Sequence, residues 1–170
     1  MPYLTYAEVR AISKETFGLD EKESVKFMFW LEKQPQLNFN SADEDYQIQS
    51  TSGVGSWLKL YMTRPILIGN AFSLNMLSDA YTSMTVHEID LETVSDLLKF
   101  RPAQSCIGHA DTAAVVSGLI GQPLPAERTT VKLGHGDELL VAQYSGPRLE
   151  EGTTTLPEGA NIKWMLVSIN

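Results

Sequence analysis

One stretch of the sequence, residues 105–120, constrains the fold more than any other. A short apolar segment runs into Gly108 and His109, and an apolar helix-like segment follows over residues 113–120. This order places the imidazole of His109 at or near a helix N-terminus, where free N–H groups and the positive end of the helix dipole favour anions. A histidine in that position either protonates a leaving oxygen beside a phosphate or serves as an ordinary capping residue.

The charge of the chain limits the ligands that it can bind. The 170 residues carry a formal net charge of -8 at pH 7. Long nucleic acids require many lysines and arginines to neutralise their phosphates, so we expect no binding of long nucleic acid. A small anionic ligand remains compatible with this composition, because it needs only a few arginines and backbone amides in one place.

The metal-ligating and reactive residue types are sparse. Cys106 is the only cysteine, which excludes an intrachain disulfide and a cysteine-cluster metal site. The three histidines are too scattered to form a close metal-binding pair, so we expect neither a metal nor another cofactor. Cys106 itself fits a small buried core residue better than a thiol nucleophile.

The start of the chain does not resemble a signal peptide, and no apolar stretch approaches the roughly 20 residues that span a bilayer. We therefore expect no membrane partner and a cytoplasmic location, in a bacterial or archaeal cell or in a virus-infected host cell.

The sequence of residues 1–64 predicts a helical extension. Thr5 and Glu8 form a capping box that begins a helix, and Asp20 caps a second helix that ends before Pro35. A polar, turn-rich stretch follows over residues 36–56, and the alternation over residues 57–61 predicts a connecting strand. We divide the chain into an N-terminal helical extension of unknown role, residues 1–64, and a second domain, residues 65–170.

The second domain mixes strands with helices. Asp90 caps one predicted helix, and Gly146 with Pro147 forces a turn before Arg148. This pattern predicts an α/β (α+β) fold, with a mixed β-sheet flanked by helices. The predicted strands cover residues 66–68, 83–89, 129–133, 138–144 and 162–169, and the predicted helices cover residues 91–99 and 113–120.

Three side chains suit phosphodiester chemistry. His109 has an imidazole that gives a proton near neutral pH, Arg148 has a guanidinium that holds a phosphate, and Glu151 has a carboxylate that accepts a hydroxyl proton or orients the other two. If a helical turn begins at Arg148, it shares a face with Glu151; on a surface loop the two are an ordinary ion pair.

Further polar residues can bind the ligand. Gln143, Asn70 and Ser73 are able to hydrogen-bond bases or riboses, and Arg128 either contacts phosphate or balances the charge of Glu127.

A series of motifs is similar to a known family. The series consists of NAFSLNML at residues 70–77, then Ile107-Gly108-His109, Arg128, DELLVAQ at residues 137–143, and RLEEG at residues 148–152. It resembles the viral type III anti-CRISPR ring nucleases and their cellular counterparts, over about residues 65–170. The first 64 residues have no counterpart in the minimal members of that family.

The resemblance implies an activity. Such proteins are homodimers that cleave cyclic tetra-adenylate without metal into linear di-adenylate with a 2′,3′-cyclic phosphate, which switches off type III CRISPR signalling. It implies His109, Arg148 and Glu151 as catalytic residues. It places six residues at the ligand: Asn70, Ser73, Asn75, Gly108, Arg128 and Gln143. Two other hypotheses remain: a protein that sequesters a cyclic oligonucleotide without cleaving it, and a structural or regulatory DNA-binding protein.

Overall fold

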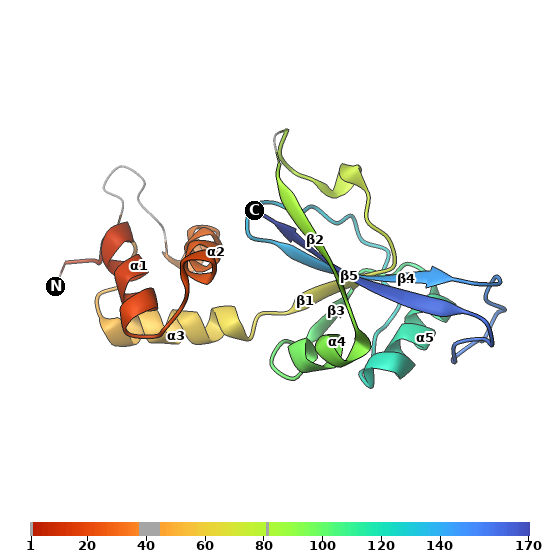
Figure 1. Cartoon of the computed structure of the whole chain (residues 1–170). Helices are drawn as coiled ribbons and strands as arrows, with labels where there is room; N and C mark the ends of the chain where they lie inside the picture. The colour runs from red at the N-terminus through yellow and green to blue at the C-terminus, as the bar shows by residue number, and fades with distance from the viewer. Residues whose placement is uncertain (1, 38–44, 81) are drawn as a thin grey trace. The chain divides into compact units, whose positions relative to one another are not determined.

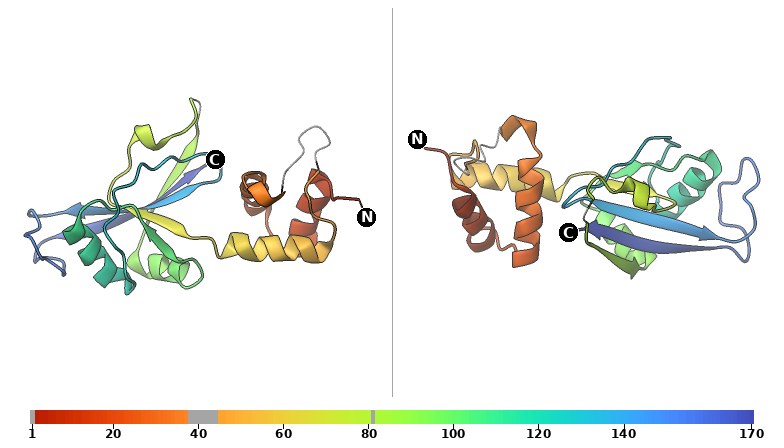
Figure 2. Two further views of the ribbon diagram at one scale, coloured as in Figure 1. Left: turned by 180° about the vertical axis from the view of Figure 1, so that it is seen from behind. Right: turned by 90° about the horizontal axis from the view of Figure 1, so that it is seen from above.

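A computed structural model describes residues 2–37, 45–80 and 82–170, and it divides the chain into two compact units, Met1–Arg64 and Pro65–Asn170 (Figures 1 and 2). Residues 38–44, part of the turn-rich stretch noted in the sequence, lie outside the described residues. No helix among the described residues is long and apolar enough to cross a membrane.

The first unit is helical. Its described elements are α1 (Tyr6–Glu15), α2 (Glu21–Glu32), the short 3-10 helix η1 (Pro35–Leu37) and α3 (Thr51–Met62). The hydroxyl of Thr5 and the carboxylate of Asp20 accept the backbone N–H groups of Glu8 and Glu23, which confirms both predicted caps. Buried side chains from all three α-helices form its core, among them Val9, Phe27, Leu31, Val54 and Leu58.

The strand predicted over residues 57–61 is wrong, because these residues belong to α3. The hydroxyl of Ser50 caps this helix by accepting the N–H of Gly53. Val54, Leu58 and Tyr61 are buried, at the spacing of four and three residues that one face of a helix requires. The short alternation at Trp57–Tyr61 is compatible with either period, and the tertiary core decides in favour of the helix.

The second unit contains a five-stranded sheet in the order β2-β5-β4-β1-β3. In this sheet β1 pairs in parallel with β3 and with β4, and β5 pairs antiparallel with β2 and with β4. The strand β5 is therefore the one that runs in the direction opposite to the other four. This mixed sheet confirms the predicted α/β (α+β) class. The elements are β1 (Ile66–Gly69), η2 (Leu74–Met76), β2 (Met84–Ile89), α4 (Leu91–Leu98), β3 (Ala103–Ser105), α5 (Ala110–Ile120), β4 (Glu138–Ser145) and β5 (Asn161–Ile169).

The two faces of this sheet are covered differently (Figures 1 and 2). On one face, which we call the helix face, α4 and α5 pack on the sheet through a core that includes Ile68, Leu140 and Trp164. On the other, the loop face, the segments around η2 and before β4 cover a smaller core that includes Leu139 and Val167. The strands β1, β4 and β5 supply alternate residues to the two cores, as the period of two requires.

The strand predicted over residues 129–133 is also wrong. Within this segment, Leu133 forms an isolated parallel bridge with Leu77, and the described residues around it form no ladder. The segment contributes Val131 and Leu133 to the core of the loop face. Its apolar alternation reflects packing onto the sheet rather than pairing within it.

Candidate functional site

The carboxyl ends of the parallel strands gather several predicted site residues at one edge of the sheet. Asn70 follows β1 directly, Gly108 and His109 follow β3 after two residues, and Gln143 lies near the end of β4. The pairing of Gly69 with Val141 puts Asn70 and Gln143 at similar heights along their strands. Open α/β sheets bind ligands at this edge, which we call the carboxyl edge.

His109 is the N-cap residue of α5, which confirms the imidazole predicted at a helix N-terminus. Its backbone is extended, with φ -110° and ψ 127°, and its side chain is exposed and makes no capping hydrogen bond. The structure therefore does not support the reading of His109 as an ordinary capping residue. The imidazole is free to meet a ligand beside the first N–H groups of the helix.

Arg128 lies against the segment that leads to His109. Its Nε donates to the carbonyl oxygen of Gly108 at 3.3 Å, and the N–H of Glu127 donates to the carbonyl oxygen of Ile107 at 2.8 Å. A Cβ on Gly108 would lie 3.2 Å from Cγ of Arg128, so the glycine permits this close approach. Among the described residues Arg128 and Glu127 form no ion pair, and the guanidinium is exposed at the site.

The NAFS segment forms a turn above the loop face. The hydroxyl of Ser73 accepts the N–H of Asn75 at 3.3 Å and caps η2. Phe72 and Met76 pack onto the core of the loop face, which fixes the turn at its base. The side chains of Ser73 and Asn75 are exposed, whereas Asn70 is half-buried.

Arg148 and Glu151 lie in the connection between β4 and β5. No helix forms there, so the helical turn that would place both on one face is absent from this described segment. Both side chains are exposed, and they form no ion pair with each other within the described residues. A Cβ on Gly146 would lie 2.7 Å from Cβ of Ala160, so only glycine allows the connection to close at its base before Arg148.

A backbone hydrogen bond brings this connection to α5. The N–H of Gly152 donates to Oδ1 of Asp111, in the first turn of α5, at 3.0 Å. A Cβ on Gly118 would lie 3.5 Å from the carbonyl oxygen of Thr154, so the connection also contacts α5 further along. The segment that carries Arg148 and Glu151 is thus held beside the helix that begins at His109. Spacing in the sequence does not reveal this contact.

The region is similar to known proteins. A family model described as STIV B116-like matches residues 66–163, more than half of the chain. The chain belongs to the STIV B116-like family. Among solved structures it is similar to B116 of Sulfolobus turreted icosahedral virus, with 31% identity and a TM-score of 0.52, over 61% of this chain and 98% of that chain. No curated protein matches the chain.

Cys106 packs within the STIV B116-like fold. Its thiol donates to the carbonyl oxygen of Ile68 at 3.3 Å, and a Cβ on Gly69 would lie 3.1 Å from its Sγ. Burial raises the pKa of the Cys106 thiol, which disfavours the reactive thiolate. These contacts support the core role expected from the sequence rather than that of a nucleophile.

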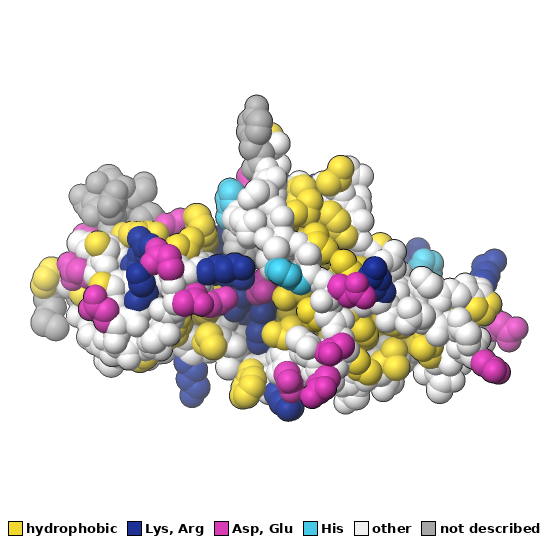
Figure 3. All heavy atoms as spheres, in the orientation of Figure 1, with side chains coloured by type: hydrophobic (Ala, Val, Ile, Leu, Met, Phe, Trp, Pro, Cys, Tyr) yellow, Lys and Arg dark blue, Asp and Glu magenta, His cyan; other side chains and the backbone are white. Residues whose placement is uncertain are grey.

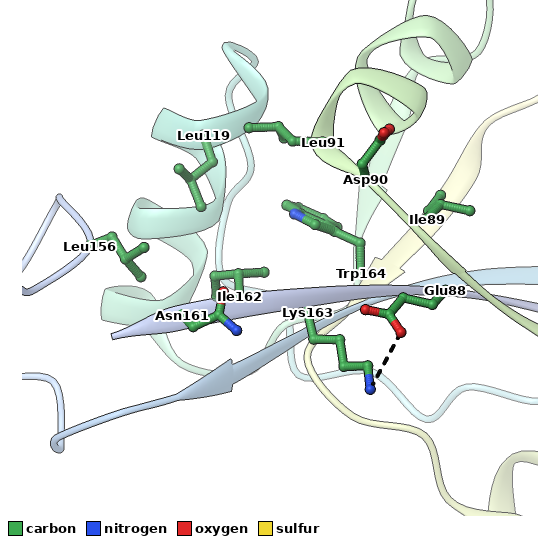
Figure 4. Close-up of a pocket in the computed structure, with 10 residues that line it drawn as sticks. All are labelled: Glu88, Ile89, Asp90, Leu91, Leu119, Leu156, Asn161, Ile162, Lys163 and Trp164. Carbon is green, nitrogen blue, oxygen red and sulfur yellow. Dashed lines mark ion pairs between the residues drawn. The ribbon is translucent and has the colours of Figure 1, made fainter. Parts of the chain in front are cut away.

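A cavity of about 720 Å³ lies away from these residues. It opens on the helix face, where Trp164 points toward α4 and α5 between Leu91 and Leu119 (Figure 4). None of the predicted site residues lines it. Volume alone would therefore select a region other than the one that holds the predicted site residues.

Sequence reasoning missed Lys132. Its Nζ donates to the carbonyl oxygen of Asn75 at 2.8 Å and brings a cation to the NAFS turn. The two residues are separated by 56 others in the chain, so no local pattern connects them. Among the described residues, no three histidine, cysteine, aspartate or glutamate side chains are grouped so that they can hold a metal ion.

Proposed function

We propose that this member of the STIV B116-like family is a metal-independent ring nuclease, which cleaves cyclic tetra-adenylate into linear di-adenylate with a 2′,3′-cyclic phosphate. Such an activity would switch off type III CRISPR signalling. The order of the NAFS, Gly-His and RLEEG motifs, which resembles that of ring nucleases, supports the proposal.

One observation carries the proposal: the hydrogen bond from Gly152 to Asp111. It joins the connection that bears Arg148 and Glu151 to the first turn of the helix that His109 begins. An acid, a phosphate-binding cation and a carboxylate then come from two adjacent segments, and all three side chains are exposed. The reaction requires these groups near one phosphate.

The chemistry needs no water and no metal. A ribose 2′-oxygen attacks the phosphorus of the phosphate on the 3′-oxygen of the same ribose. The new 2′-O–P bond forms, and the bond from that phosphorus to the 5′-oxygen of the next nucleotide breaks. His109 gives its proton to the departing 5′-oxygen, and Arg148 binds the non-bridging oxygens as negative charge grows. Glu151 takes the proton of the 2′-hydroxyl, or it orients the other two side chains and that proton passes to solvent. Alignment of the attacking oxygen supplies the rest of the acceleration.

The proposal includes a homodimer. A ring of four nucleotides has two-fold symmetry, and a two-fold dimer presents one set of catalytic residues to each half. Two cuts on opposite sides of the ring release two di-adenylates. Ligand contacts are assigned to Asn70, Ser73, Asn75, Gly108, Arg128 and Gln143.

The test incubates the full chain with cyclic tetra-adenylate in EDTA and identifies products by mass spectrometry. We expect di-adenylate with a cyclic phosphate. The substitution His109→Ala should lower the cleavage rate by about 10²- to 10⁴-fold, because the leaving oxygen loses its proton donor. His87→Ala serves as the matched control, since His87 is an exposed residue of β2 outside the proposed site.

Three results would overturn the proposal. Tight binding with an intact ring would favour sequestration. The absence of both binding and cleavage would exclude cyclic tetra-adenylate as the ligand. Cleavage that EDTA abolishes would exclude the metal-independent mechanism.

A further inference from the structure

The register between β4 and β5 places Lys163 next to Gln143. The two residues are directly paired, as are Ser145 and Asn161 at the ends of the same strands. Directly paired residues of antiparallel strands point to the same face, with Cβ atoms about 5 Å apart. Gln143 and Lys163 are both exposed.

The loop face of the sheet changes character along these two strands. Leu139 and Val141 on β4 and Val167 on β5 belong to its apolar core. Two residues beyond Val141, the same face presents Gln143 and its neighbour Lys163. The polar part begins where the strands approach the carboxyl edge, so Lys163 belongs to the same edge as Asn70 and Gln143.

The ammonium of Lys163 is paired with the carboxylate of Glu88, and breaking this ion pair costs little free energy. Its Nζ lies 3.5 Å from Oε2 of Glu88, and the two side chains are 48% and 65% exposed. Figure 4 shows that the side chain of Lys163 extends toward Glu88 and away from the ring of Trp164, and both members of the pair are among the residues that line the cavity. An exposed ion pair contributes little to stability, so a phosphate is able to replace Glu88 as the partner.

The position of Lys163 complements that of the arginines. β3 and β5 are separated by three strand spacings, about 14 Å in total. Arg128 contacts Gly108 at the β3 side, while Lys163 lies on β5. A ring with four phosphates presents negative charge around its whole circumference, and a chain with a net charge of -8 must provide cations locally.

We infer that Lys163 is a phosphate-binding residue for the cyclic oligonucleotide, and that Glu88 holds its ammonium while the site is empty. The inference rests on the proposed function, because it assigns a further contact in the same site. It predicts opposite effects for two neighbours of opposite charge: Lys163 strengthens binding of the ring, whereas Glu88 weakens it.

The experiment measures the affinity of the full chain for cyclic tetra-adenylate in the His109→Ala background, in which the ring stays intact. We expect Lys163→Gln to weaken binding about tenfold at low salt, and Glu88→Gln to strengthen it about threefold, because a competing carboxylate is removed. Both effects should shrink at about 0.5 M salt, where charges are screened. Lys163→Arg should restore most of the affinity.

Lys99→Gln is the matched control. Lys99 forms a comparable exposed pair with Asp96, at 2.8 Å, but it lies at the end of α4. Thermal melting of each variant verifies its folding. Equal affinity of Lys163→Gln and Lys99→Gln would overturn the inference and leave the proposed function standing. A shift of affinity in the same direction for Glu88→Gln and Lys163→Gln would indicate a purely structural ion pair and would also overturn the inference. Failure of the unsubstituted chain to bind the ring would refute the proposed function, and the inference with it.

Discussion

The side chain of His109 makes no hydrogen bond to the helix that it begins, although its backbone is that of an N-cap residue. Serine at such a position accepts an N–H group of the first turn and stabilises a helix by about 1 kcal/mol. We expect His109→Ser to raise the melting temperature of the second unit by about 4 °C. The same substitution should lower the rate of ring cleavage about 10²- to 10⁴-fold, as in His109→Ala. Calorimetry and the product assay measure the two effects on one preparation.

His109→Ala is the control for this prediction, because alanine removes the imidazole without adding a cap. Equal melting temperatures for the serine and alanine variants would show that the first N–H groups of α5 already have partners. Cleavage by the serine variant at the rate of the unsubstituted chain would show that the histidine is not the proton donor.

Cys106 allows a test that depends on pH. Burial raises the pKa of its thiol above the ordinary value of 9.0. Alkylation by iodoacetamide requires the thiolate, so the rate in the folded protein should keep rising with pH beyond 9 and stay below the rate in the unfolded chain. Cys106→Ala should retain cleavage within about twofold, because the thiol takes no part in the chemistry. Fast alkylation at pH 7, together with loss of cleavage in the alanine variant, would instead indicate a nucleophile.

At the scale of single residues, the sequence predicted what depends on near neighbours. The caps at Thr5, Asp20 and Asp90 were predicted correctly, because each bonds an N–H group three residues later. The contact of Gly152 with Asp111 spans 41 residues and has no local signal. The predicted roles of Arg148, Glu151 and the ligand-binding residues stay predictions.

At the scale of elements, α3 shows where pattern reading fails. Gly53 and Gly55 indicated a turn, yet both lie within the helix. A Cβ on Gly53 would lie 2.9 Å from Cγ2 of Ile48, and one on Gly55 would lie 2.8 Å from a ring carbon of Phe17. The glycines allow this close packing, so their reason is tertiary and cannot be found in the local sequence.

The connection between β4 and β5 depends on Asp111 for its position. Removal of the carboxylate in Asp111→Ala takes away the acceptor of the Gly152 N–H. We expect the cleavage rate to fall about tenfold, because small displacements of catalytic groups are costly. The melting temperature should change little, since the bond is exposed. Single-turnover kinetics with cyclic tetra-adenylate measure the effect.

Asp111→Asn provides the matched variant, because its amide oxygen still accepts the Gly152 N–H. It should retain most of the rate that Asp111→Ala loses. Equal rates for both variants and the unsubstituted chain would show that this hydrogen bond does not position Arg148 and Glu151.

At the scale of the whole molecule, charge constrains the partners. On the face shown in Figure 3, the described lysine and arginine side chains are interspersed with aspartate and glutamate. Proteins that bind long nucleic acids usually gather their cations into a continuous surface. The arrangement suits local recognition of a small anion better than binding along a duplex, and it weighs against the DNA-binding hypothesis.

The two units have separate cores, and the family match begins at residue 66. Because 98% of the viral B116 chain corresponds to 61% of this one, we expect residues 65–170 to fold alone and to cleave the ring within about threefold of the full chain's rate. The full chain should show two unfolding transitions, the weaker from the first unit, since about 60 residues bury a smaller fraction of their surface. Calorimetry of both chains assigns each transition. A rate loss above about tenfold would show that the first unit contributes to the site or to its assembly, because an independent unit leaves the chemistry unchanged.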